Sequence, residues 1–126
     1  MDHLIIPRGA WRISPQSFRR SLLSRWPDAT LREVRTTERR AIFEYELPMS
    51  HSRVYGDLDR RGRYVSFSGD IRDMAEFALW FRSLVPESEQ LLFSDEGMNS
   101  SLDLKPDTTL GEIFSLAGYT PPQEAG

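Results

Sequence analysis

Two stretches in which apolar and polar side chains alternate constrain the fold more than any other feature of the sequence. Residues 43–47 read Phe-Glu-Tyr-Glu-Leu, and residues 64–67 read Tyr-Val-Ser-Phe. A period of two is typical of a strand with one buried side and one solvent-facing side. Each stretch follows a short arginine-bearing turn and an earlier strand-like segment. Residues 30–47 and 53–68 are therefore predicted to form two antiparallel hairpins.

Helical periodicity marks three other segments. The first begins at Ser14 and Pro15, a typical helix start, and ends at Pro27. The longest apolar stripe extends over residues 71–84. Residues 109–112, Thr-Leu-Gly-Glu, have the spacing of a capping box and predict a short C-terminal helix. Two further short strands are expected at residues 89–94 and 101–105.

Together these elements predict an α+β fold, with an antiparallel sheet of about five to six strands, two main helices packed on one face and a short C-terminal helix. The 126 residues fit one domain, expected to span residues 1–118, with residues 119–126 as a flexible tail. His3 is expected in a mobile N-terminus. No apolar run is long enough to cross a membrane and the first residues do not resemble a signal peptide, which favours a cytoplasmic protein.

Side chains suited to catalysis or metal binding are sparse. The chain has no cysteine, which excludes disulfides, thiolate nucleophiles and cysteine-ligated metals. His51 in a loop and the Asp57/Asp59 pair are the candidates for an enzyme. A solvated polar loop explains His51 equally well, and an ordinary hairpin end explains the two aspartates. Four oxygen-bearing residues around one loop are a candidate cation site without the spacing of a calcium loop: Asp95, Glu96, Asn99 and Asp103. We therefore expect no catalytic residue, no metal and no cofactor.

Charge is divided between the two halves of the chain. Residues 1–63 carry 13 arginines and 8 acids, net +5, whereas residues 64–126 carry 3 bases and 11 acids, net −8. Acidic loops around an apolar anchor suit the capture of a basic protein surface. The residues expected to bind such a partner are Trp80, Glu87, Glu89, Asp95, Glu96, Met98, Asp103 and Asp107.

The basic half offers an alternative partner, a nucleic acid or another ligand. Two hairpin turns carry paired arginines, and these turns can lie at the same end of the sheet. The arginines concerned are Arg39, Arg40, Arg60 and Arg61. Glu44 and Glu46 on the neighbouring strand oppose contact with phosphates, as does the sequence pI of about 5.4.

The order of features from about residue 63 to residue 116 resembles small immunity proteins encoded beside bacterial polymorphic or contact-delivered toxins. Tyr-Val-Ser-Phe-Ser-Gly-Asp at residues 64–70 leads into Phe-Ala-Leu-Trp-Phe-Arg-Ser-Leu-Val-Pro at 77–86, then Leu-Leu-Phe-Ser-Asp-Glu at 91–96 and Thr-Thr-Leu-Gly-Glu-Ile at 108–113. The resemblance implies a non-enzymatic α+β domain in the bacterial cytoplasm. It also implies that the domain binds one cognate toxin and blocks the toxin's active site.

Overall fold

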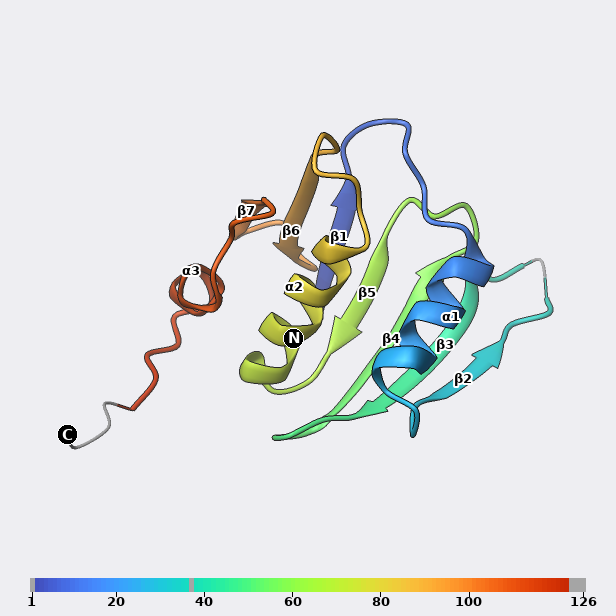
Figure 1. Cartoon of the computed structure of the whole chain (residues 1–126), viewed down its shortest axis with the longest axis horizontal. Coiled ribbons are helices and arrows are strands. Elements are labelled where there is room, and N and C mark those ends of the chain that lie inside the picture. Colours follow the sequence, from blue (N-terminus) through green and yellow to red (C-terminus); the bar gives the residue numbers. More distant parts are fainter. Residues whose placement is uncertain (1, 37, 123–126) are drawn as a thin grey trace.

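The computed structural model describes residues 2–36 and 38–122 of the chain (Figure 1). Seven strands form one antiparallel sheet in the order β2-β3-β4-β5-β1-β6-β7. The elements are β1 (His3–Pro7), α1 (Pro15–Arg25), β2 (Thr30–Glu33), β3 (Ala41–Pro48), β4 (Arg53–Asp59), β5 (Val65–Ser68), α2 (Ile71–Ser83), β6 (Leu91–Asp95), β7 (Ser101–Leu104) and α3 (Leu110–Leu116). Helices α1 and α2 lie on one face of the sheet, and α3 contacts α2 and the edge strand β7.

The two predicted hairpins are confirmed as the β2–β3 and β4–β5 pairs. Their alternation sets the two faces of the sheet, because Tyr45 lies opposite Gly56, and Gly56 lies opposite Phe67. Tyr45 and Phe67 point to the helical side and are almost fully buried. Glutamates of β3 therefore point to the other side.

A cluster of aromatic rings joins the helices to the sheet. The ring of Phe77 on α2 lies 4.8 Å from that of Phe67, 5.7 Å from that of Tyr45 and 5.9 Å from that of Trp26, measured between ring centroids. Burial of rings of this size supplies much of a core's stabilisation. The predicted apolar stripe of α2 is the side that covers the sheet, and Asp70 caps this helix by accepting a hydrogen bond from the Arg72 backbone N–H.

The predicted α+β architecture is confirmed in outline, but the strand count was too low. The segment expected to be a mobile N-terminus is strand β1, which lies in the middle of the sheet between β5 and β6. His3 is buried there, with its ring stacked 5.2 Å from that of Phe93. Only three consecutive apolar residues mark this strand in the sequence, too few to predict a strand on their own.

The C-terminal helix begins with the predicted capping box, since the Thr109 side chain and the Glu112 backbone and side chain are reciprocally bonded. Tyr119, the first residue of the expected flexible tail, packs its ring 5.1 Å from that of Phe114. Residues 123–126 of that tail lie outside the described residues. Among the residues that the structure describes, no helix is long and apolar enough to cross a membrane.

Candidate partner-binding surface

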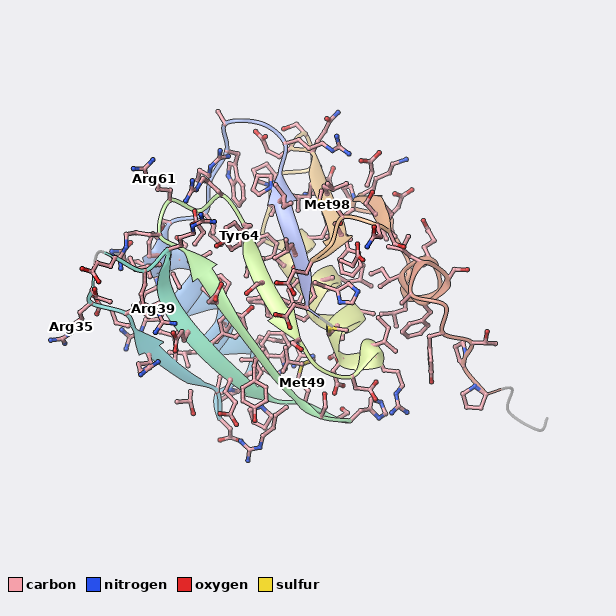
Figure 2. The ribbon with its side chains drawn as sticks, turned by 180° about the vertical axis from the view of Figure 1, so that it is seen from behind. Arg35, Arg39, Met49, Arg61, Tyr64 and Met98 are labelled. Carbon is pink, nitrogen blue, oxygen red and sulfur yellow. The ribbon has the colours of Figure 1, made fainter. Side chains whose placement is uncertain are left out.

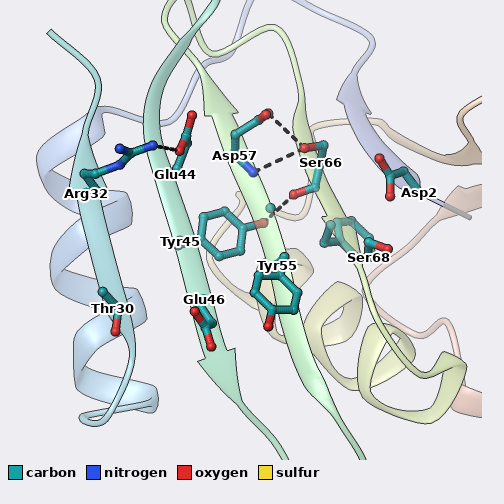
Figure 3. A pocket seen from close by; sticks show the side chains of 12 residues that line it. Asp2, Thr30, Arg32, Glu44, Tyr45, Glu46, Tyr55, Asp57, Ser66 and Ser68 are labelled. Carbon is teal, nitrogen blue, oxygen red and sulfur yellow. Dashed lines mark hydrogen bonds and ion pairs between the residues drawn. The ribbon is translucent and has the colours of Figure 1, made fainter.

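The face of the sheet opposite α1 and α2 is not covered by a helix in the described part of the chain (Figure 2). This surface, here called the open face, is formed by those side chains of strands β2, β3, β4, β5, β1 and β6 that point away from the helices. Its centre holds a hollow of about 430 Å³, here called the polar groove (Figure 3). The residues that line the groove are Asp2, Thr30, Arg32, Glu44, Tyr45, Glu46, Tyr55, Gly56, Asp57, Ser66, Phe67 and Ser68.

The floor of the groove is formed where β4 and β5 approach closely. A Cβ atom on Gly56 would lie 2.0 Å from the Ser66 backbone oxygen and 2.4 Å from the Tyr45 hydroxyl oxygen, so only glycine fits. The Tyr45 hydroxyl crosses beneath this position and donates a hydrogen bond of 2.5 Å to the same backbone oxygen. On the open side, the short Ser66 and Ser68 side chains leave space between longer neighbours.

Arginines neutralise the two glutamates in the groove wall. Arg32 and Arg39 both form ion pairs with Glu44, the latter at 2.8 Å. Arg53 forms an ion pair of 2.5 Å with Glu46. The hydrogen bond from Arg32 lowers the pKa of Glu44 in spite of its partial burial. Both glutamates thus have local charge partners.

Asp57 differs from these glutamates because it forms no ion pair within the described residues. Its backbone N–H donates to Ser66 Oγ at 3.2 Å, and Ser66 Oγ donates to Asp57 Oδ1 at 2.8 Å. Partial burial raises the pKa of the Asp57 carboxyl above its ordinary value. Repulsion from Glu44 and Asp2 adds to this effect, which the Ser66 hydrogen bond and the charge of Arg39 oppose only in part. The environment of Asp57 therefore disfavours the ionised form of its carboxyl relative to the protonated form.

An apolar strip borders the groove on the open face. Ile5 of β1 belongs to the buried core, so alternation turns Leu4 and Ile6 to the opposite side. Leu92 of β6 lies opposite Ile6, and Leu4 lies opposite Ser66 of the groove. Leu4, Ile6 and Leu92 are each half-buried, and none of the three is part of the core cluster. The open face therefore places apolar side chains beside charged ones.

The predicted apolar anchor Trp80 does not lie on this face. Its ring lies among the rings between α1 and α2, 4.9 Å from that of Trp26 and 5.4 Å from that of Phe77. Helical spacing placed Trp80 at the edge of the polar side of α2, but α1 packs against that edge and half-buries the ring. Trp80 is therefore half-buried and not freely exposed, and its role as a contact for a partner stays a prediction.

The predicted acidic loops do not form a single surface. Glu87, Glu89 and Asp103 line one hollow of about 290 Å³ together with Arg8, which forms a 3.0 Å ion pair with Asp103. These residues lie near the start of β6, as does the exposed Asp107 on the loop beyond β7. Glu96 and Met98 are exposed in the turn at the opposite end of β6.

Asp95 is not available to a partner in the way predicted. The residue is 7% exposed, and Asp95 Oδ1 accepts a hydrogen bond of 2.9 Å from the Ser100 backbone N–H. The carboxylate thus organises the turn between β6 and β7. Asp95 is a structural residue of this turn.

The two arginine-bearing turns do meet at one end of the sheet. The Arg60 backbone N–H donates to the Arg40 carbonyl at 2.6 Å, and the Arg60 guanidinium donates to three carbonyls of residues 34–41 at 2.9–3.3 Å. Arg60 therefore joins the turns. Arg39 pairs with Glu44, whereas Arg40 and Arg61 are exposed and form no ion pair within the described residues.

The residues considered for catalysis are separated. Asp59 is fully buried and accepts hydrogen bonds from the Arg63 guanidinium and from the backbone N–H groups of Arg61 and Arg63. Asp57 lines the polar groove, but neither Asp59 nor the exposed His51 does. Within residues 2–36 and 38–122, no three histidine, aspartate or glutamate side chains are grouped so that they could hold a metal ion.

Two features of the open face were missed in the sequence. The apolar run Leu4-Ile5-Ile6 is too short to predict a strand on its own, although its β-branched isoleucines are typical of one. The sequence offers Asp57 only as a partner of Asp59, because its hydrogen bond with Ser66 and its position beside Glu44 depend on strand pairing that the sequence does not show. Comparison with protein-family models, with curated proteins and with solved structures finds no match to this chain.

Proposed function

We propose that the chain is a non-enzymatic inhibitor that binds another protein through the open face, as the resemblance to cytoplasmic immunity proteins implies. The observation that carries this proposal is the uncovered sheet face on which the apolar strip adjoins the polar groove. Protein interfaces combine apolar contacts at the centre with polar groups around them. The partner would be a toxin, and binding would occlude the toxin's active site.

The charges of the open face favour a protein with basic groups over a nucleic acid. Four carboxylates and one arginine line the polar groove. A phosphate backbone placed there would meet Asp2, Asp57 and the paired glutamates. Complementary charges on a protein partner accelerate association and select the correct partner.

Co-expression with the product of the neighbouring gene, followed by affinity capture of the tagged chain, tests the proposal. The complex should be recovered with the wild type and lost with Leu92→Glu, which places a charge in the apolar strip. Leu110→Glu is the matched control, because Leu110 is 42% exposed on α3, the helix that packs against α2 and the edge strand β7. Recovery of the complex with both variants alike, or no complex with the wild type, would contradict the proposal.

Nucleic-acid binding at the arginine-bearing end is a second proposal, supported by the two turns that Arg60 joins. Its mark would be salt-sensitive binding of RNA or DNA that Arg40→Ala/Arg61→Ala weakens. Arg60 is unsuitable for this test because its guanidinium is engaged with backbone carbonyls. Absence of binding in low-salt buffer would remove this candidate.

A further inference from the structure

We propose that the polar groove receives the guanidinium group of an arginine side chain from the partner, paired with Asp57 and flanked by Tyr55. This inference rests on the proposed function, because it assigns the chemistry of the contact through which the open face recognises its partner. The proposed occupant is a planar cation carried on a protein chain.

The first support is the charge balance within the groove. Glu44 and Glu46 have arginine partners in the chain itself, at distances of hydrogen-bonded ion pairs. Asp57 has none within the described residues, although Arg32 and Arg39 lie at the neighbouring Glu44. A half-buried carboxylate without a cation is costly, and a cation supplied by a partner would remove that cost.

The second support is the fixed orientation of the Asp57 carboxylate. Ser66 Oγ accepts from the Asp57 backbone N–H and donates to Asp57 Oδ1, so two hydrogen bonds hold the side chain on the groove floor (Figure 3). Asp57 Oδ2 makes no hydrogen bond within the described residues. A carboxylate that is already oriented loses little rotamer freedom when it binds.

The third support is Tyr55, the most exposed aromatic side chain of the open face. It is 53% exposed and lies two residues before Asp57 on β4, so both side chains point to the same side. A guanidinium stacks on an aromatic ring while its N–H groups bond a carboxylate. An ammonium group is a point charge and does not match both surfaces equally well.

The groups that face Asp57 favour a cation as the occupant. Glu44 of β3 and Asp2 beside β1 repel the ionised carboxylate, and partial burial disfavours it further. Arg39 and the Ser66 hydroxyl counter these effects without forming an ion pair. A bound cation would therefore offset the burial and the repulsion that disfavour the ionised Asp57 carboxylate in the free protein.

Titration of the isotope-labelled chain with short blocked peptides tests the chemistry without the partner. The probes are acetyl-Gly-Arg-Gly-amide, the matched lysine peptide and the citrulline peptide, which keeps the shape without the charge. The arginine peptide should shift the backbone amide signals of Gly56, Asp57 and Ser66 saturably. Asp57→Asn should weaken this binding at least tenfold, and Tyr55→Leu should weaken it severalfold. Asp28→Asn, which removes an equal charge from the exposed turn after α1, should leave it unchanged.

Each opposite result overturns the inference. Arginine binding that survives Asp57→Asn, equal binding of the citrulline or lysine peptide, or no shift at all would each do so. The proposed function is judged separately by capture of the partner protein. If Leu92→Glu abolishes the complex while Asp57→Asn leaves its affinity intact, the open face is the interface but the arginine contact is wrong.

Discussion

Replacement of Gly56 by alanine should destabilise the protein strongly, because the position lies where β4, β5 and the Tyr45 ring meet. The new Cβ would lie 2.0 Å from the Ser66 backbone oxygen, against an ordinary contact of at least 3.4 Å. Relief requires the strands to separate by more than about 1 Å, which no rotamer change supplies. Overpacking of this kind costs about 3 kcal/mol. Displacement of the Tyr45 hydroxyl from its backbone acceptor adds about 1 kcal/mol.

The expected loss is therefore about 4 kcal/mol, which corresponds to a fall in Tm of about 15 °C for a chain of this length. Chemical and thermal unfolding followed by circular dichroism measure both quantities. Gly111→Ala is the control, since the nearest atom to its added Cβ is 3.8 Å away and alanine favours the helix by about 0.5–1 kcal/mol. A Gly56→Ala protein within 1 kcal/mol of the wild type would refute the close strand approach that forms the groove floor.

Three other changes test separate parts of the account. Asp57→Asn should stabilise the fold by up to about 1 kcal/mol at pH 7, because a carboxyl with a raised pKa weakens the folded state as the pH rises through that pKa. Melting at pH 3 should show no such gain, and an equal gain at both pH values would contradict the electrostatic explanation. Arg60→Ala should cost about 1.5–3 kcal/mol and speed hydrogen exchange near Val34, Thr36 and Ala41, whose carbonyls accept hydrogen bonds from the Arg60 guanidinium; unchanged exchange would show that the turns are held by other contacts. Trp80→Ala should cost about 3 kcal/mol with little effect on partner affinity in the folded fraction, as measured by calorimetry, because its ring lies between the helices.

Periodicity predicted most of the architecture, since local apolar spacing reflects which side of an element is buried. The hairpins, the caps at Ser14 and Asp70 and the capping box at Thr109 all occur where the pattern placed them. Strand β1 could not be predicted, because a strand paired on both sides can form with only a short apolar run in its sequence. Contacts across the sheet replace the alternation that a longer strand would show.

The binding surface was less predictable than the fold, because charge along the sequence does not report charge partners in space. Arg8 is 95 residues from Asp103 in the sequence and forms an ion pair with it. The Asp95 carboxylate accepts a hydrogen bond within its own turn, from the Ser100 backbone N–H. Asp57 became distinctive only when its neighbours on β3 and β5 were known. Packing of α1 against α2 likewise half-buries the ring of Trp80, which the sequence predicts as an exposed contact.

Hydroxyl-radical footprinting of the chain alone and in complex with its co-purified partner tests the central claim, that the open face is the interface. Tyr55, Leu4 and Leu92 should be strongly protected, with Leu110 on α3 oxidised as in the free chain. Protection of Leu110 with Tyr55 and Leu92 still fully reactive would contradict that claim.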